Sequence, residues 1–359
     1  MRWYIKYLIL SLIFVIIYVS IYQYYDKYFD VKKSKTSNSS ELIISVVVCG
    51  ISRIEEVLAI IKSALIFSTP KDRIKFIIVT ENDLLELLQE KLETYQNQRH
   101  FLFDLREIKF PGEDQELWRK LFKPCASQRL FLPSVLSDVD ATILYLDSDT
   151  LFLSPPQEIF DYLRHFNSSQ IAAMTPESEH KNVAWYPRFS SHPFYGECGV
   201  NSGVMLMDLT KMRSLKWEQE MLRLYEKYRL NLVFGDQDLI NIYFSQHPEQ
   251  LFILPCAFNY RPDHCMYVSM CPVEDGIKLL HGNRGYFHKT ENQPIFNQLY
   301  ESIQKHQFHS NPCRIIKEVE YQIQGTNSSK CSKLSDKFLQ TPKRILKRNC
   351  ETDDYRFDQ

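Results

Sequence analysis

Two aspartates that follow directly on an apolar run are the residues of this sequence best suited to chemistry. Asp147 and Asp149 come after Ile143–Leu146, and the apolar Leu151–Leu153 follows at once. A short apolar run between polar segments predicts a strand buried on both faces. Alternate residues of an extended chain point the same way, so we expect the two carboxylates to converge. Because like charges in a half-buried place repel, the pair predicts a divalent cation bound by oxygens.

The Asp-x-Asp spacing is not decisive by itself, because the same triplet is common in solvated turns and helix caps. Its position at a predicted strand end favours a site, since ligands of open α/β sheets bind there. Three more stretches suit such a site: VNSGV, in which Gly203 lets a ligand approach the backbone; GDQD at a helix start; and HGNRG at a strand end. With His281, the aspartates make a two-carboxylate, one-imidazole set, and its nitrogen favours Mn²⁺ over Mg²⁺.

The elements that must position these residues alternate between strand and helix in the first half of the chain. This alternation predicts an α/β fold, with a mostly parallel sheet and helices on both faces. Neither GxGxxG nor GxxxxGK[ST] follows the first strand, which argues against a dinucleotide-dependent or P-loop enzyme. The predicted elements are strands at 42–48 and 74–79, helices at 54–65, 84–95 and 126–136, and an edge strand at 101–110.

The second half is less regular. Asp236 is a good helix cap, which places the start of a helix there. The last fifty residues are mixed, and we expect a solvated tail that includes the basic stretch 330–348. The predicted elements are strands at 170–174, 204–207 and 277–280, and helices at 211–228 and 236–246.

The N-terminal segment predicts a membrane anchor. Tyr7–Tyr25 carries no charge and is long enough to cross a bilayer as a helix. A cleaved signal peptide is the alternative, although its apolar core would be shorter and a small-residue cleavage site is expected. Sequons at Asn38, Asn167 and Asn327 favour a lumenal catalytic domain, hence a single-pass type II protein of the endoplasmic reticulum or Golgi. The predicted regions are a cytoplasmic tail at 1–6, a transmembrane signal anchor at 7–25, a stem at 26–40, a catalytic domain at 41–306 and a C-terminal tail region at 307–359.

The composition of the chain limits the classes of partner that it can be expected to bind. Lys plus Arg total 43 and Asp plus Glu total 44, so nothing in the charge points to nucleic acid. The nine cysteines lack the regular spacing of a zinc site, and in an oxidising compartment they can pair with one left over. The short spacing of Cys265 and Cys271 predicts a local disulfide between them.

Seven stretches together resemble glycosyltransferase family 8, which has the GT-A fold, and within it the glucoside xylosyltransferases. The resemblance covers about residues 42–300. The stretches that carry it are KLFKPCASQRLFLP (120–133), LYLDSDTLFL (144–153), QIAAMTPE (170–177), HPFYGECGVNSGVMLM (192–207), GDQDLIN (235–241), NYRPDHC (259–265) and LLHGNRG (279–285).

This resemblance implies a retaining transfer from a UDP-sugar, with Mn²⁺ holding the diphosphate. By resemblance Asp147, Asp149 and His281 are the metal ligands, and Asp236 accepts a donor-sugar hydroxyl while Gln237 lies on the reactive face. The other implied donor-binding residues are Arg129, then Asn201, Ser202 and Gly203 at the sugar, and Cys49 and Gly50 facing the uracil. Where many members have Gly-x-x-Lys-Pro-Trp after the histidine, this chain departs from the pattern, and Arg284 is our candidate for the β-phosphate.

The function that the resemblance implies is an α-1,3 transfer of xylose from UDP-xylose to O-linked glucose on EGF-like repeats, such as those of Notch. Two alternatives stay open. One is a family 8 transferase that uses another UDP-sugar, galactose or glucose. The other is a non-catalytic sugar-binding member of the fold. The crowd of aromatic residues at 185–195, with Arg188 and His192, is our candidate acceptor rim, and plain core is its alternative.

Overall fold

The computed structural model describes residues 41–69, 72–112, 115–121, 123, 125–267, 270–324 and 329–351. The predicted cytoplasmic tail, membrane anchor and stem, with the sequons at Asn38 and Asn327, lie outside these residues. Asn167 is described and exposed. Within the described part of the chain, no helix combines the length and apolar character that crossing a membrane requires.

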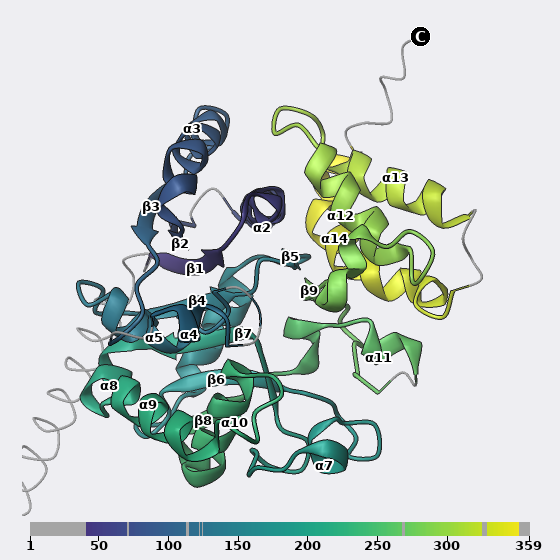
Figure 1. Cartoon of the computed structure of the whole chain (residues 1–359). Helices are drawn as coiled ribbons and strands as arrows, with labels where there is room; N and C mark the ends of the chain where they lie inside the picture. The colour runs from purple at the N-terminus through teal and green to yellow at the C-terminus, as the bar shows by residue number, and fades with distance from the viewer. Residues whose placement is uncertain are drawn as a thin grey trace, which may run out of the picture. The chain divides into compact units, whose positions relative to one another are not determined.

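A seven-stranded sheet forms the centre of the molecule, in the order β3-β2-β1-β4-β7-β6-β8 (Figure 1). Its neighbours are parallel except β7, which runs antiparallel to both β4 and β6. The predicted mostly parallel sheet is therefore confirmed, with β3 as its edge. Its strands are β1 Leu42–Val48, β2 Ile74–Thr80, β3 Leu102–Glu107, β4 Thr142–Leu146, β6 Ala172–Pro176, β7 Val200–Asp208 and β8 Leu251–Ile253; β5 Thr150–Phe152 and β9 Leu279–His281 form a second, antiparallel pair.

Alternating side chains of the strands build two apolar cores, one on each face of the sheet. Ile44 and Val46 of β1 belong to one core, whereas Ile43 belongs to the other. In β4, Leu144 packs into the first core and Tyr145 into the second. This is the two-residue period of a strand that is buried on both sides, and it explains why the strand sequences are almost continuously apolar.

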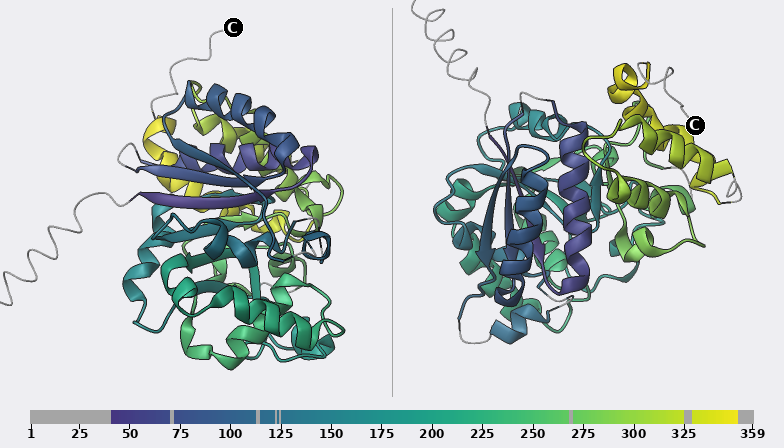
Figure 2. Two further views of the ribbon diagram at one scale, coloured as in Figure 1. Left: turned by 60° about the vertical axis from the view of Figure 1, so that its left-hand side comes forward. Right: turned by 90° about the horizontal axis from the view of Figure 1, so that it is seen from above.

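Helices cover both faces of the sheet, as predicted (Figure 2). The first core contains α2 Ile54–Phe67, α3 Leu85–Gln96, α12 Ile295–Lys305, α13 Cys313–Gln324 and α14 Ser335–Glu351. The second contains α5 Gln128–Val135, α8 Leu209–Ser214, α9 Trp217–Tyr228 and α10 Asp236–Gln246. Short helices are α4 Gln115–Arg119, α6 Gln157–Phe160, α7 Tyr186–Phe189 and α11 Asp263–Met266, with 3-10 turns η1 Ile51–Arg53, η5 Cys256–Asn259 and η6 Asn283–His288 among others.

Three predicted elements of the second half need correction. The helix expected at 211–228 is two helices, because Lys216 adopts a left-handed conformation with φ 56° and breaks it. The strand expected at 204–207 already begins at Val200, so the VNSG stretch is part of β7. Asp236 is the first residue of α10 but does not cap it, since Gly235 precedes the helix and no side chain bonds there.

The C-terminal region differs from the solvated tail expected after residue 306. Through Glu351 it forms α13 and α14, whose apolar faces pack into the first core beside α2 and α12 (Figure 1). The amphipathic period was visible in the sequence, but the residues it packs against lie far away in the chain. A lone amphipathic helix gives no sign of whether it has a partner.

All nine cysteines are accounted for by four disulfides and the free Cys198. The predicted count of one unpaired cysteine is confirmed, whereas the predicted Cys265–Cys271 bridge is wrong. Chain folding brings more distant partners to both residues, and spacing alone cannot reveal them. The pairs are Cys49–Cys125, Cys256–Cys271, Cys265–Cys331 and Cys313–Cys350.

Candidate active site

Asp147, Asp149 and His281 converge, with one ligand atom from each lying within 4.8 Å of the others. Nε2 of His281 is 3.2 Å from Oδ1 of Asp149 and 3.8 Å from Oδ2 of Asp147. The reason differs from the one expected, because residues 148 and 149 form a turn rather than extended chain. Pairing of β5 with β9 sets Thr150 opposite His281 and brings the histidine to the aspartates.

Hydrogen bonds behind His281 fix which of its nitrogens faces the carboxylates. The backbone N–H of Gly203 donates to Oδ1 of Asn201, which also accepts a bond from Nδ2 of Asn259 (2.8 Å). Oδ1 of Asn259 is therefore left to accept from Nδ1 of His281, 2.8 Å away. The Nε2 lone pair then points at two carboxylates, an arrangement that needs a cation. The donor set thus fits a divalent metal ion.

Asp149 is suited to metal binding electrostatically as well. Burial works against its ionisation, but positive charge at His281 outweighs that effect and lowers the pKa of Asp149 to about 2. A metal ion beside the neutral imidazole would supply the same positive charge. The carboxylate is therefore ionised at neutral pH, as a metal ligand must be.

Gly203 is required by the packing of the metal triad, as we call Asp147, Asp149 and His281. A Cβ at this position would lie 2.3 Å from Cε1 of His281 and 3.0 Å from Oδ2 of Asp147. The close approach inferred from the glycine is thus made by the triad itself. Because β7 is antiparallel to β4, the start of β7 lies beside the end of β4, and the N–H of Asp147 donates to the carbonyl of Gly203 (2.8 Å).

Arg129, at the start of α5, joins the triad to α10. Its Nη2 lies 2.8 Å from Oδ1 of Asp147 and its Nε lies 2.6 Å from Oδ2 of Asp236. Burial disfavours the guanidinium charge, but these two carboxylates outweigh it and raise the pKa of Arg129. The Nε–H donates to the carbonyl of Ala126, so Oδ2 of Asp236 accepts no hydrogen bond from the described residues. Asp236 is 2% exposed, and burial raises its pKa.

Gln237 is held at the same place by the start of β7. Its Oε1 accepts hydrogen bonds from Nδ2 of Asn201 (3.1 Å) and from the N–H (3.1 Å) and hydroxyl (3.3 Å) of Ser202. Ser202 in turn accepts from Nη1 of Arg129. The structure therefore brings together Asn201, Ser202, Gln237 and Arg129, which the sequence placed on separate stretches.

Asp238 is structural and does not face the cavity. One of its oxygens accepts from the hydroxyl of Tyr186 (2.8 Å), and the other accepts from the N–H groups of Val233 and Phe234 (2.6 Å each). His192 is also buried, with Nε2 3.4 Å from Asp238. Tyr186 and His192 are therefore core residues, and the predicted acceptor rim is wrong for both.

Three predicted donor contacts have partners within the protein. Cys49 is bonded to Cys125, and the N–H of Gly50 donates to Oε2 of Glu81 (2.7 Å). Neither residue lines the cavity that is described below. Arg284 does line it, but its guanidinium pairs with the carboxylate of Asp263.

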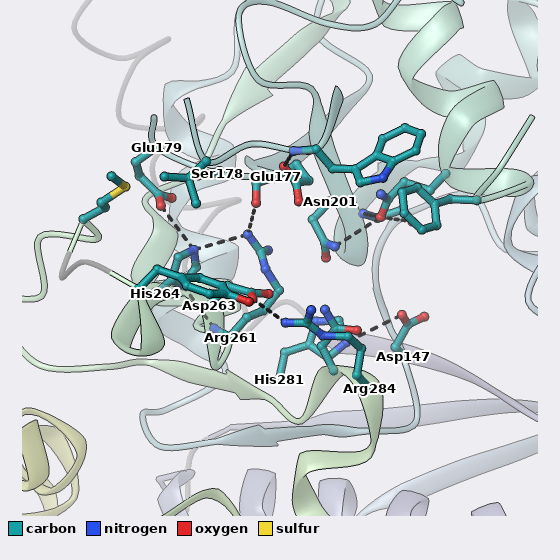
Figure 3. Close-up of a pocket in the computed structure, with 18 of the residues that line it drawn as sticks. Asp147, Glu177, Ser178, Glu179, Asn201, Arg261, Asp263, His264, His281 and Arg284 are labelled. Carbon is teal, nitrogen blue, oxygen red and sulfur yellow. Dashed lines mark hydrogen bonds and ion pairs between the residues drawn. The ribbon is translucent and has the colours of Figure 1, made fainter. Parts of the chain in front are cut away.

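A cavity of about 550 Å³ is lined by Asp147 and His281 of the metal triad and by Arg129, Asp236 and Gln237. Trp185 and Arg188 also line it, so part of the predicted aromatic segment does face the site. Figure 3 shows a further polar group on the wall away from Asp147. No role was predicted for this group, although all of its members except Glu179 lie in the TPE and NYRPDHC stretches. It comprises Glu177, Glu179, Arg261, Asp263 and His264.

A mixed α/β sheet, with two aspartates and a histidine at the end of β4 that fit a divalent metal, is the arrangement of a GT-A-like glycosyltransferase. The sequence model of Glycosyl transferase family 8 matches residues 21–285, and the chain belongs to this family.

The relatives agree with this family. The chain is 42% identical over 332 residues to Glucoside xylosyltransferase 1 of Mus musculus, covering 89% of this chain and 81% of the mouse protein. It is 48% identical over 283 residues to Glucoside xylosyltransferase 2 of Xenopus laevis, covering 75% and 66%. Among solved structures, mouse Xyloside xylosyltransferase 1 in its apo form superposes with a TM-score of 0.51 at 19% identity, over 68% of this chain and 98% of that one. The chain is a glycosyltransferase, and the last comparison supports its fold.

Proposed function

We propose that this enzyme transfers xylose from UDP-xylose to the 3-hydroxyl of glucose O-linked to EGF-like repeats, with retention of configuration at the anomeric carbon. The observation that carries the proposal is the convergence of Asp147, Asp149 and His281 at the edge of the cavity that Asp147, His281, Asp236 and Gln237 line. The glucoside xylosyltransferases, at 42% and 48% identity, supply the donor and acceptor class.

The metal that best fits the proposed site is Mn²⁺. One nitrogen and two carboxylate ligands suit a transition metal better than Mg²⁺, which prefers oxygen alone. A divalent cation bound to Asp147, Asp149 and His281 would stabilise the negative charge of the departing diphosphate.

Transfer by front-face attack uses the residues of the cavity. The bond from the sugar C1 to the phosphate oxygen breaks, the bond from C1 to the acceptor oxygen forms on the same face, and the acceptor proton passes to the departing phosphate. Asp236, with an oxygen that accepts no hydrogen bond from the described residues, holds a donor-sugar hydroxyl. Gln237 contributes its amide dipole beside the reacting carbon, and its bonds to β7 keep it in place.

A carboxylate nucleophile, as in retaining glycosidases, is the alternative, and two carboxylates flank Gln237. Both oxygens of Asp238 already accept hydrogen bonds from Tyr186 and the backbone. Asp236 is the carboxylate left for a covalent sugar adduct. Mass spectrometry of the enzyme during turnover tests this directly, and a glycosyl adduct on Asp236 would overturn front-face attack.

A donor panel tests the proposed reaction. Soluble residues 41–359 would be incubated with Mn²⁺, an O-glucosylated EGF module and either UDP-xylose, UDP-glucose or UDP-galactose. We expect transfer from UDP-xylose with product carrying a new α-1,3 linkage. Preference for UDP-galactose or UDP-glucose would assign the chain to a different transferase, and failure of every donor with the folded protein would support a sugar-binding role.

A lumenal, membrane-anchored location is the second part of the proposal. Its support is the uncharged Tyr7–Tyr25 segment, the exposed sequon at Asn167 and the four disulfides, which persist in oxidising compartments. In sealed microsomes we expect the large domain to resist protease and to lose mass on treatment with an N-glycosidase. Digestion of that domain in sealed vesicles would reverse the topology, and a mature N-terminus near residue 26 would show a cleaved signal.

A further inference from the structure

Arg261 is a buried cation in the cavity wall with an unused hydrogen-bond donor. Its side chain is 2% exposed, and Nη2 donates to the carbonyls of Pro176 (3.1 Å) and Glu177 (2.7 Å). Nη1 has no partner among the described residues, although Arg261 lines the cavity. Burial lowers the pKa of Arg261. Leaving a buried charged donor unpaired costs free energy, so such a group signals a ligand.

Glu179 lies beside Arg261 and is fixed by His264. The backbone N–H of Arg261 donates to Nδ1 of His264 (3.1 Å), so a neutral imidazole carries its proton on Nε2, which also lies 3.2 Å from Nη2 of Arg261. Nε2 lies 3.2 Å from Oε2 of Glu179. Burial opposes ionisation of Glu179, but the contact with His264 outweighs it and lowers the pKa of the carboxyl. Neither carboxylate oxygen accepts a hydrogen bond from the described residues, and the ion-pair contact with His264 is made by Oε2.

We propose that Glu179 and Arg261 form a subsite that binds one hydroxyl group of the acceptor sugar. A hydroxyl both donates and accepts, so a single group can donate to Oε1 of Glu179 and accept from Nη1 of Arg261. Both residues line the same cavity as Asp147 and His281, but on another wall (Figure 3). Asp147, Asp236, Arg129 and Gln237 lie at the end of the cavity that is proposed to bind the donor. The wall with Glu179 and Arg261 is therefore left for the acceptor.

This inference rests on the proposed function, because it takes the acceptor to be a glucoside. The 3-hydroxyl is the proposed attacking group, which leaves the 2-, 4- and 6-hydroxyls for the subsite. Hydrogen bonds to a fixed charged pair reject an acceptor that lacks the matching hydroxyl, since both polar groups are then left unpaired. The subsite therefore selects among acceptor sugars and leaves donor binding unchanged.

Acceptor kinetics of Glu179→Ala and Glu179→Gln test the subsite, with a soluble aryl glucoside, as both anomers, for the acceptor. We expect the acceptor KM of Glu179→Ala to rise roughly tenfold to a hundredfold, with the donor KM and the hydrolysis of UDP-xylose without acceptor unchanged. Glu179→Gln keeps an oxygen acceptor, so its acceptor KM should lie between those of the natural enzyme and Glu179→Ala. Glu197→Gln is the matched control, because Glu197 is exposed on the surface.

Deoxyglucosides lacking the 2-, 4- or 6-hydroxyl separate recognition from a structural effect. One of them should be a poor acceptor for the natural enzyme and suffer no further loss with Glu179→Ala, because the partner is already absent. Arg261→Lys should show the same pattern: activity falls for acceptors that keep the matching hydroxyl and falls no further for the one that lacks it. Thermal unfolding checks that this variant is folded. Equal losses with every acceptor, or a raised donor KM, would overturn the subsite.

Failure of the proposed function gives a different result. If the natural enzyme transfers no sugar to any glucoside but accepts another sugar, the proposed acceptor is wrong, and deoxy analogues of the true acceptor then test Glu179 in the same way. Binding of the aryl glucoside to the enzyme loaded with Mn²⁺ and UDP, followed by calorimetry, supplies a readout that needs no turnover. We expect weaker binding by Glu179→Ala and an unchanged affinity for UDP.

Discussion

At the scale of single residues, the types of side chain in the site were readable from the sequence, but their pairings were not. Asp147, Asp149 and His281 converge as predicted, because several polar stretches at predicted element ends pointed to one site. The partners that hold them, Asn259 and Arg129, come from elements whose contacts depend on the complete fold. A hydrogen bond between distant residues leaves no mark in local sequence.

Substitution of the triad aspartates is expected to abolish transfer. Asp147→Asn or Asp149→Asn removes a charged ligand, and the Lewis-acid contribution lost is worth several kcal/mol, or roughly a thousandfold in rate. Transfer assays with a Mn²⁺ titration check this, with circular dichroism to verify folding. Asp83→Asn is the control because Asp83 is exposed. Near-normal activity in both variants would exclude the metal assignment.

Asn259 is expected to matter for metal affinity although it touches no metal. Asn259→Ala leaves Nδ1 of His281 without its acceptor, and loss of such an outer partner lowers affinity by about 10–100-fold. Mn²⁺ binding followed by electron paramagnetic resonance measures this without turnover. The control is Asn97→Ala, at an exposed asparagine. Unchanged Mn²⁺ affinity would show that the imidazole is oriented by other contacts.

Gln237→Ala is expected to lower kcat by roughly a hundredfold and to raise the donor KM much less, because the interaction strengthens in the transition state. Steady-state kinetics with varied UDP-xylose separates the two constants. Gln246→Ala, at an exposed position near the end of the same helix, serves as the control. If kcat is unchanged, Gln237 has no part in the reaction and serves only to bind Asn201 and Ser202.

At the scale of elements, the parallel half of the sheet was predictable, whereas the antiparallel direction of β7 was not. The first strands and helices alternate with a clear apolar period, and β1, β2 and β4 lie where that period puts them. The antiparallel β7 reads as a fully buried strand whichever way it runs, so its direction is invisible in the sequence. That direction brings Asn201–Gly203 to the end of β4, and so it builds the site.

Glu56 of α2 connects three elements around the metal triad. It is 1% exposed and accepts hydrogen bonds from Arg53, from the hydroxyl of Ser148 (3.0 Å) and from Nε2 of His288 (2.7 Å). Ser148 lies between the two aspartates, so this carboxylate anchors their turn to α2 and η6.

Glu56→Gln is therefore expected to weaken Mn²⁺ binding, roughly tenfold, because the turn that carries the ligands loses its charged anchor. Calorimetric Mn²⁺ titration is the measurement, and thermal unfolding reports the accompanying loss of stability. The neighbouring Glu55→Gln removes an exposed carboxylate from the same helix and should leave affinity unchanged. Equal affinities in the two variants would make Glu56 a purely stabilising residue.

At the scale of the whole molecule, the C-terminal helices belong to the catalytic unit. The Cys265–Cys331 disulfide joins α11, which carries Asp263 and His264, to the segment before α14. A sequence reading that stops at the family motifs misses this, because residues beyond them carry only an amphipathic period. The wall of the cavity is thus supported by a region more than sixty residues away along the chain.

Removing disulfides one pair at a time is expected to separate stability from acceptor binding. The pairs Cys265–Cys331 and Cys313–Cys350 close loops of 66 and 37 residues, so each should contribute about 4 kcal/mol, or a fall in Tm on the order of 10 °C when both cysteines become serine. Only the first pair adjoins His264, which orients Glu179. Its loss should therefore also raise the acceptor KM, with UDP affinity unchanged, whereas loss of the second should lower Tm alone. Parallel kinetics and thermal unfolding of the two double variants measure this, and equal acceptor KM values would show that α11 keeps its position without the bridge.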